Sequence, residues 1–199
     1  MENEDIFLDT VLKFHKEDRW KDILKLNEKS DKDCAIKILW VWPSEENLDF
    51  LRKICDERNI QGVISVGCGS GLLEWILSKS LGLDVVGYEI NKQWWESKYS
   101  VPTFIKLRYH DQSVQENVLD PRYALLFCYF NNGPAFLEYI DNYKGNTVII
   151  IGPSRGAGRH TDPEPFKANF GGMKWRLYGY QEVKDTKDFI VVYVRLCDN

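Results

Sequence analysis

Residues 63–90 read VISVGCGSGLLEWILSKSLGLDVVGYEI, and this stretch decides the fold. An apolar run ends in three closely spaced glycines, Gly67, Gly69 and Gly71, and an apolar stripe at helical spacing follows at once. A second apolar run then leads to one acid, Glu89. The pattern predicts a strand, a glycine turn, a helix and a second strand that carries a carboxylate at its end.

Each part of this unit has a chemical use. Glycine permits positive φ and close approach of a ligand to the backbone, and the first turn of the next helix presents unpaired N–H groups. The Glu89 carboxylate lies 20 positions after Gly69, where an acid can accept hydrogen bonds from a ribose. The unit therefore predicts a nucleoside-containing cofactor, and glycines that merely tighten a loop are the simpler alternative.

The glycine spacing separates two cofactor classes. A nicotinamide-binding turn has the order G-x-G-x-x-G/A with a small sixth residue, whereas Leu72 here is bulky, which disfavours an oxidoreductase. The order in V-G-C-G-S-G-L-L-E instead resembles the first motif of the class I (Rossmann-like) S-adenosylmethionine-dependent methyltransferases. The resemblance implies S-adenosylmethionine as the cofactor, with Glu89 on the ribose hydroxyls. It places the turn residues under the methionine and ribose: Gly67, Cys68, Gly69 and Gly71.

The resemblance also assigns residues on either side of this unit. Ile90 would face the adenine ring, and Asp111 would accept a bond from the adenine amino group. The alternative for Asp111 is the cap of a short helix that begins near Ser113. The family usually has Asp or Glu two residues before the first glycine, where it holds the cofactor's ammonium group, but this chain has Ser65. Charge-assisted hydrogen bonds contribute roughly 1.5–3 kcal/mol against about 1 kcal/mol for neutral ones, so binding is expected to weaken about tenfold unless another carboxylate substitutes.

Two later segments are candidates for the acceptor site. Several amino-group methyltransferases have D/N-P-P-Y/F after the fourth strand, and Asn131-Asn132-Gly-Pro only partly resembles this motif. The asparagines are candidates for orienting a nucleophile, and an Asn-Gly turn is the structural alternative. Residues 153–172 lack periodicity, and Arg155, Arg159 and His160 make this loop a candidate substrate flap. A solvated, poorly ordered loop is the equal alternative.

The rest of the chain predicts a doubly wound α/β fold of about seven strands, mostly parallel, with a C-terminal antiparallel hairpin and helices on both faces. A division at Pro43 predicts an N-terminal helical extension or lid over 1–44 and a Rossmann-like domain over 45–199. Helices are expected at 4–28, 45–57 and 134–143, while 35–43 is either a short helix or extended. Strands are expected at 63–66, 85–90, 103–109, 123–129, 148–151, 173–181 and 189–196.

Composition narrows the partners. The net charge of −4 favours a small-molecule or protein acceptor over nucleic acid. An odd number of cysteines, five, without C-x-x-C pairs indicates reduced thiols in a cytoplasmic protein. The three histidines lack metal-ligand spacing, and no apolar run is long enough for a membrane span. Composition leaves the oligomeric state and the acceptor open.

The sequence thus predicts a methyltransferase with an unidentified acceptor. The alternative is a protein that keeps the fold and the cofactor but transfers nothing, and acts as a cofactor sensor or a partner-binding scaffold. Ser65 and the irregular N-N-G-P segment favour this alternative, whereas the glycines and Glu89 favour retained binding.

Overall fold

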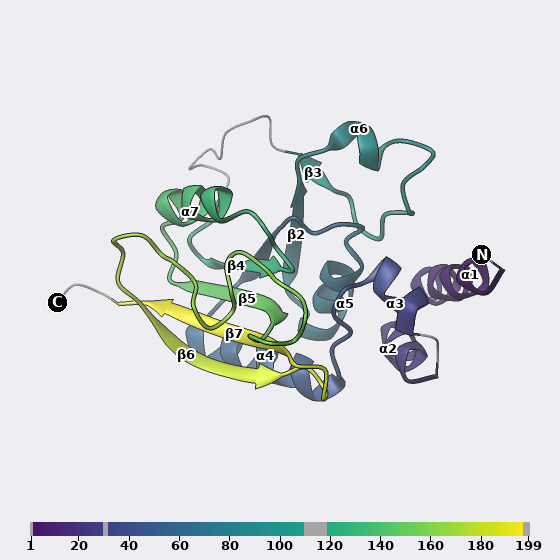
Figure 1. Cartoon of the computed structure of the whole chain (residues 1–199), viewed down its shortest axis with the longest axis horizontal. Helices are drawn as coiled ribbons and strands as arrows, with labels where there is room; N and C mark the ends of the chain where they lie inside the picture. The colour runs from purple at the N-terminus through teal and green to yellow at the C-terminus, as the bar shows by residue number, and fades with distance from the viewer. Residues whose placement is uncertain (1, 30–31, 110–118, 197–199) are drawn as a thin grey trace.

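One sheet of seven strands organises the computed structural model, which describes residues 2–29, 32–109 and 119–196 (Figure 1). The strands are β1 Gly62–Val66, β2 Asp84–Glu89, β3 Arg108–Tyr109, β4 Tyr123–Cys128, β5 Thr147–Pro153, β6 Trp175–Glu182 and β7 Asp188–Arg195. Their order is β3-β2-β1-β4-β5-β7-β6, and β7 runs antiparallel to both of its neighbours. The predicted mostly parallel sheet with a C-terminal antiparallel hairpin is confirmed.

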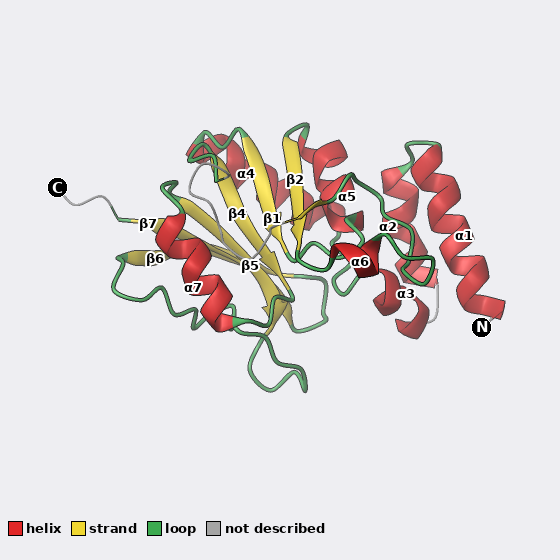
Figure 2. Cartoon of the chain, turned by 90° about the horizontal axis from the view of Figure 1, so that it is seen from above, coloured by secondary structure: helices red, strands yellow, loops and turns green. Residues whose placement is uncertain are grey.

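The two faces of the sheet bury two separate apolar clusters, because successive side chains of a strand point to opposite faces. Val63, Leu126 and Ile149 pack with helices α4 Glu45–Arg58 and α5 Leu72–Leu81. Ile64 and Phe127 lie in the other cluster, with helix α7 Gly133–Asn142. Figure 2 shows α7 on the side of the sheet opposite α4 and α5, so the prediction of helices on both faces is also confirmed.

The N-terminal segment forms three helices, α1 Glu2–Lys16, α2 Trp20–Lys29 and α3 Lys32–Ile38, which lie beside α5 (Figure 1). Val11 and Ile23 are fully buried and share one apolar cluster with Trp75 of α5. The chain is helical to Ile38 and then continues without regular structure to Pro43, so the short helix expected within 35–43 is found for residues 35–38 alone. The segment is therefore packed into the core on the α5 side.

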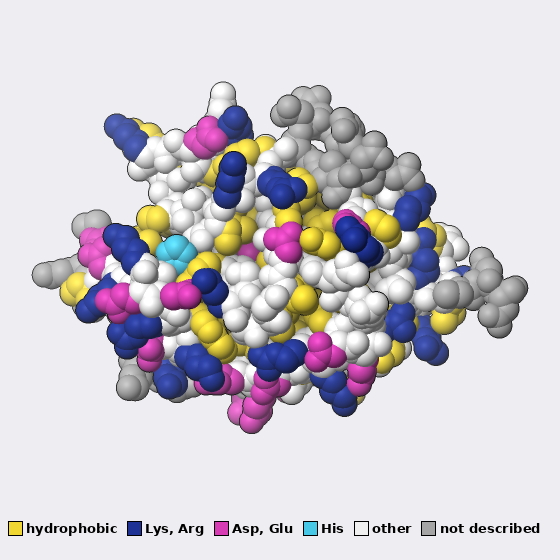
Figure 3. All heavy atoms as spheres, turned by 180° about the vertical axis from the view of Figure 1, so that it is seen from behind, with side chains coloured by type: hydrophobic (Ala, Val, Ile, Leu, Met, Phe, Trp, Pro, Cys, Tyr) yellow, Lys and Arg dark blue, Asp and Glu magenta, His cyan; other side chains and the backbone are white. Residues whose placement is uncertain are grey.

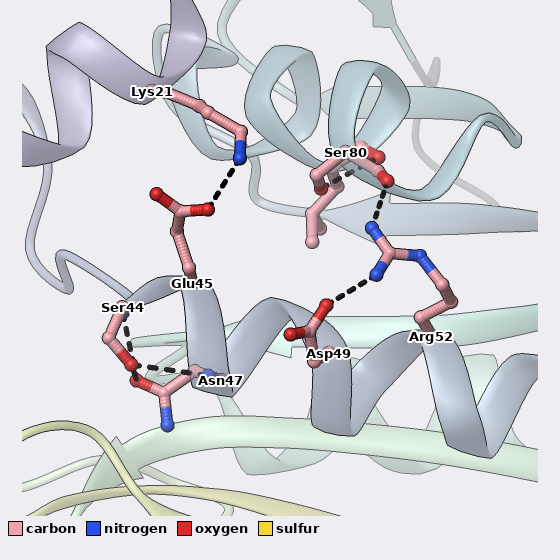
Figure 4. Close-up of polar contacts among 8 residues, drawn as sticks. Lys21, Ser44, Glu45, Asn47, Asp49, Arg52 and Ser80 are labelled. Carbon is pink, nitrogen blue, oxygen red and sulfur yellow. Dashed lines mark hydrogen bonds and ion pairs between the residues drawn. The ribbon is translucent and has the colours of Figure 1, made fainter.

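Polar contacts fix the start of α4 between the N-terminal segment and the end of the sheet (Figure 4). Ser44 accepts a hydrogen bond from the Asn47 backbone, and the Asn47 side chain accepts one from the Ser44 backbone, which is a capping box. The Asn47 amide group also donates to the backbone of Glu182 at 2.9 Å. Lys21 of α2 pairs with Glu45 at 2.6 Å, which ties α2 to the same end of α4.

The strand predicted over 103–109 is wrong for residues 103–107, since β3 comprises Arg108 and Tyr109 alone. The Phe104 N–H instead donates to the Ser70 carbonyl at 2.8 Å. Ile105 packs against Gly71 so closely that an added Cβ there would meet it at 2.4 Å. Burial of these two side chains against the glycine turn and α5 outweighs the extension of β3. Within the described ranges, the chain holds no helix long and apolar enough to cross a membrane.

Candidate functional site

The glycine turn lies between the carboxyl end of β1 and the start of α5. Gly67, Gly69 and Gly71 have φ of 69°, 60° and 79°, the left-handed region that side chains other than glycine rarely adopt. The Gly67 N–H donates to the Tyr88 carbonyl of β2 at 2.9 Å, which holds the turn against the neighbouring strand. The turn therefore lies at the carboxyl edge of the parallel strands, where doubly wound sheets bind ligands.

Glu89 meets this turn at the end of β2. Its Oε1 accepts a hydrogen bond from the Gly69 N–H at 2.6 Å, and its side chain is half-buried. Trp95, in helix α6 Lys92–Trp95, lies beside the open side of Gly69. The glycine turn and the acid, separated in sequence, thus form one site with an aromatic side chain at its edge.

The two residues assigned to the adenine differ in what the structure says of them. Ile90 follows Glu89 directly and is 77% exposed, so one face of its side chain is open to a ligand. Asp111 lies outside the described residues. Their assigned roles stay predictions.

Ser65 and Glu74 form a buried pair beneath the turn. Ser65 in β1 is fully buried, and its hydroxyl donates to Oε1 of Glu74 at 2.6 Å. Glu74 lies in the first turn of α5 and is 1% exposed, and its Oε2 has no hydrogen-bond partner among the described residues. Burial raises the pKa of Glu74 to about 7, although the Ser65 hydrogen bond acts to lower it.

A cavity of about 150 Å³ opens beside this pair. Its wall contains the glycine turn and Glu74 on one side, Cys128 and Tyr129 at the end of β4 on another, and Trp40 of the N-terminal segment. An unpartnered buried carboxylate oxygen in the wall and glycines at its rim suit a ligand with an amino group. A larger cavity of about 600 Å³ lies between α2, α4 and the β6–β7 turn, but none of the glycine-turn residues 67–71 lines it. We therefore place the candidate site in the smaller cavity.

Cys68 lies inside the turn and is half-buried. An added Cβ at Gly87 would meet its sulfur at 2.6 Å, so the thiol fills the space above β2. Burial and the nearby carboxylates of Glu74 and Glu89 raise the pKa of the thiol far above its ordinary value. Cys68 is therefore a neutral space-filling group at neutral pH.

The end of β4 carries Tyr129, whose φ of 51° is unusual for a residue other than glycine. Its ring stacks on Trp40 with 5.2 Å between centroids, and its hydroxyl donates to Oδ1 of buried Asp188 at 2.6 Å. Arg159 donates to Oδ2 of the same carboxylate at 3.1 Å. The end of β4, the N-terminal segment, β7 and the loop after β5 therefore meet at one point beside the cavity.

Asn131 and Asn132 are exposed and lie just beyond this point. Asn131 forms an isolated bridge to Asp162. The Asn132 side chain accepts from the Ala135 N–H at 3.1 Å and caps α7, as the turn interpretation of this segment expects. The role of either asparagine toward a methyl acceptor stays a prediction.

The three candidate substrate residues of the loop after β5 lie together. Arg155, Arg159 and His160 line one cavity of about 160 Å³. Arg159 also lines a neighbouring cavity of about 280 Å³, whose wall includes Trp40 and Asp188. In residues 2–29, 32–109 and 119–196, no cluster of three potential metal ligands occurs.

Three contributors to the site were not singled out in the sequence: Glu74, Tyr129 and Trp40. The available signal for Glu74 was its place directly after the glycines, in V-G-C-G-S-G-L-L-E, where a carboxylate starts the next helix. Trp40 and Tyr129 come together only through the packing of the N-terminal segment on the end of β4.

The strand order and the single antiparallel strand β7 define a Rossmann-like α/β fold, as the order of the predicted elements indicated. No protein-family model matches the chain, and no curated protein matches it in sequence. Solved structures similar to it include a TehB-like SAM-dependent methyltransferase from Corynebacterium glutamicum, with 18% identity and a TM-score of 0.47 over 76% of this chain and 87% of that one.

Two further similar structures contain S-adenosylhomocysteine. Magnesium protoporphyrin IX methyltransferase from Synechocystis is 14% identical, with a TM-score of 0.44 over 76% of this chain and 83% of that chain. An RNA methyltransferase from Salinibacter ruber is 12% identical, with a TM-score of 0.47 over 76% of this chain and 92% of that chain.

Proposed function

We propose that the chain is an S-adenosylmethionine-dependent methyltransferase. The contact between the Gly69 N–H and the Glu89 carboxylate, at 2.6 Å, carries this proposal. It brings a ribose-binding acid to a glycine turn that has no small residue at the sixth position for a nicotinamide cofactor. The turn, the acid and the neighbouring cavity lie at the carboxyl ends of β1, β2 and β4.

The residues of this chain suit a reaction that needs alignment and dryness more than proton transfer. The cofactor, when bound, supplies a methyl group on a sulfonium, which is already an activated leaving group. Trp40 and Tyr129 form a stacked aromatic pair in the wall of the cavity, and Asp188 fixes the Tyr129 hydroxyl. Burial and the Asp188 hydrogen bond raise the pKa of Tyr129, so this hydroxyl stays a hydrogen-bond donor.

We infer that the acceptor enters beside Trp40, where the cavity of about 280 Å³ adjoins the cofactor cavity. Arg159 lies in the wall of the cavity of about 280 Å³. Arg155 and His160 line the adjoining cavity in the loop after β5. On the face shown in Figure 3, Lys and Arg side chains are interspersed with Asp and Glu. The net charge of −4 favours a small molecule or a protein segment over a nucleic acid as the acceptor.

Titration calorimetry with S-adenosylmethionine, S-adenosylhomocysteine and NAD tests the cofactor. Heat of binding is expected with the first two, and tight binding of NAD alone would refute the proposal. A Glu89→Ala variant is expected to lose most of its affinity, whereas the matched control Glu138→Ala, at an exposed position of α7, is expected to keep it. Unchanged affinity in Glu89→Ala would place the ligand elsewhere.

Incubation of the protein with methyl-labelled S-adenosylmethionine and fractionated cell extract tests transfer. Label in one fraction identifies the acceptor class. Binding without label in any fraction would favour the second candidate, a cofactor sensor or partner-binding scaffold. The use of Asn132 as a helix cap is the observation that favours this candidate, because the side chain is then engaged away from an acceptor.

A further inference from the structure

We propose that Glu74 binds the ammonium group of the cofactor's amino-acid tail and replaces the strand acid that this chain lacks at Ser65. The inference rests on the proposed function and names a residue for it. Glu74 lies in the first turn of α5 and lines the cavity of about 150 Å³ beside the glycine turn.

The geometry of the buried pair supports this role. Ser65 uses its hydroxyl to hold Oε1 of Glu74 at 2.6 Å, so the serine positions the acid and does not compete with it. The other oxygen, Oε2, is buried, and the described part of the chain supplies no hydrogen-bond partner for it. Glu74 also lines the cavity beneath the glycine turn. A buried acceptor without a partner costs free energy, which a donor from a ligand would recover.

The charges around the cavity call for a cation. No ion pair of the described residues includes Glu74. The titratable groups that interact with Glu74 are the Glu89 carboxylate of β2, the Cys68 thiol of the glycine turn and the Cys128 thiol of β4. Burial raises the pKa of both thiols, so they are neutral, and Glu89 adds a second negative charge. An ammonium group carries both the charge and the donors that Oε2 lacks.

Two ligands that differ in the amino-acid tail separate this inference from the proposed function. S-adenosylhomocysteine has the tail, whereas 5′-methylthioadenosine keeps the adenosine and the sulfur and has no ammonium group. Glu74→Gln is expected to weaken binding of S-adenosylhomocysteine about tenfold, the loss of one charge-assisted bond, and to change binding of 5′-methylthioadenosine less than about twofold. The exposed Glu138→Gln is expected to change neither.

Each outcome decides one question. If the wild type binds neither ligand, the proposed function is wrong. If it binds both, but Glu74→Gln leaves the ratio of their dissociation constants unchanged, the role of Glu74 is wrong and the proposed function stands.

A measurement on the wild type alone covers the case in which Glu74→Gln fails to fold. Protonated Glu74 cannot attract a cation, so affinity for S-adenosylhomocysteine should rise as the pH increases from 5.5 to 7. The ratio of the dissociation constants of 5′-methylthioadenosine and S-adenosylhomocysteine should therefore rise about tenfold over this range, because both ligands share the contacts to Glu89. The ligand's own ammonium group keeps its charge there, because an α-amino group titrates near pH 8. A ratio that does not vary with pH would overturn the inference.

Discussion

Replacing Glu74 by Gln should change the pH dependence of folding stability, in the absence of any ligand. The folded protein raises the pKa of this carboxyl from 4.5 to about 7 by burial. A difference of about 2.5 pH units, at 1.36 kcal/mol per unit, corresponds to about 3 kcal/mol. Glu74 is 1% exposed, so solvent screening does not reduce this figure appreciably.

The sign follows from which state holds the proton. Below about pH 4.5, Glu74 is protonated in both the folded and the unfolded chain, and it costs nothing. Between pH 4.5 and 7 the unfolded chain loses this proton while the folded chain retains it, so folding becomes less favourable as the pH rises. Above pH 7 the folded chain carries a buried charge with its full cost. Gln is neutral throughout and has nearly the same shape.

The assay is urea unfolding of the wild type and Glu74→Gln, from pH 4.5 to 8, followed by tryptophan fluorescence with buried Trp75 as one reporter. The free energy of unfolding of the wild type minus that of the variant should fall by about 3 kcal/mol across this range. Taking the difference cancels the other titrating groups. The exposed Glu138→Gln, measured in the same way, is the matched control. A flat difference for Glu74→Gln would refute the buried environment assigned to this carboxyl.

Three further results are expected. Gly82→Ala should lower the free energy of unfolding by about 1–2 kcal/mol, because its φ of 69° is left-handed while nothing lies near the added Cβ. Gly71→Ala should lower it by about 1–3 kcal/mol more, because the added Cβ would also overlap Ile105. Equal losses in urea unfolding would contradict this packing. Native Cys68 should react with an alkylating reagent at least about tenfold more slowly than in the unfolded chain, since its pKa is raised, and mass spectrometry of its peptide would reveal equal rates. Trp40→Ala removes the stack on Tyr129. If residues 1–44 act as a lid, this variant should release S-adenosylhomocysteine about two- to tenfold faster, with little change in Tm. An unchanged release rate in stopped-flow fluorescence would show that these residues only pack against the domain.

The order of the elements was predictable because it depends on local patterns. The unit at 63–90 contains its own glycine turn and helix, and the apolar runs at 123–129 and 148–151 are long enough to cross a sheet buried on both faces. The failure at 103–107 has a tertiary cause. Phe104 and Ile105 suit a strand, yet the chain buries them on the glycine turn, and no local pattern reports that choice.

The contact between Glu89 and Gly69 was also predictable, because neighbouring parallel strands present their carboxyl ends at one edge of the sheet. The point where Tyr129, Asp188 and Arg159 meet was not. These residues come from β4, β7 and the loop between β5 and β6, and the order in which β7 inserts beside β5 decides whether they touch. The sequence supplies the three side chains without this order.

The direction of the Glu74 side chain depends on the residue at which helix α5 begins. A Glu in the first turn of a helix is favoured by the helix dipole on any side, so the sequence alone gives Glu74 no direction. Successive residues of a helix are rotated by about 100°, so beginning α5 one residue earlier or later would turn Glu74 away from Ser65. Gly71, in the left-handed conformation, fixes that start at Leu72. The same glycine that forms the turn therefore also directs the Glu74 carboxylate toward the Ser65 hydroxyl.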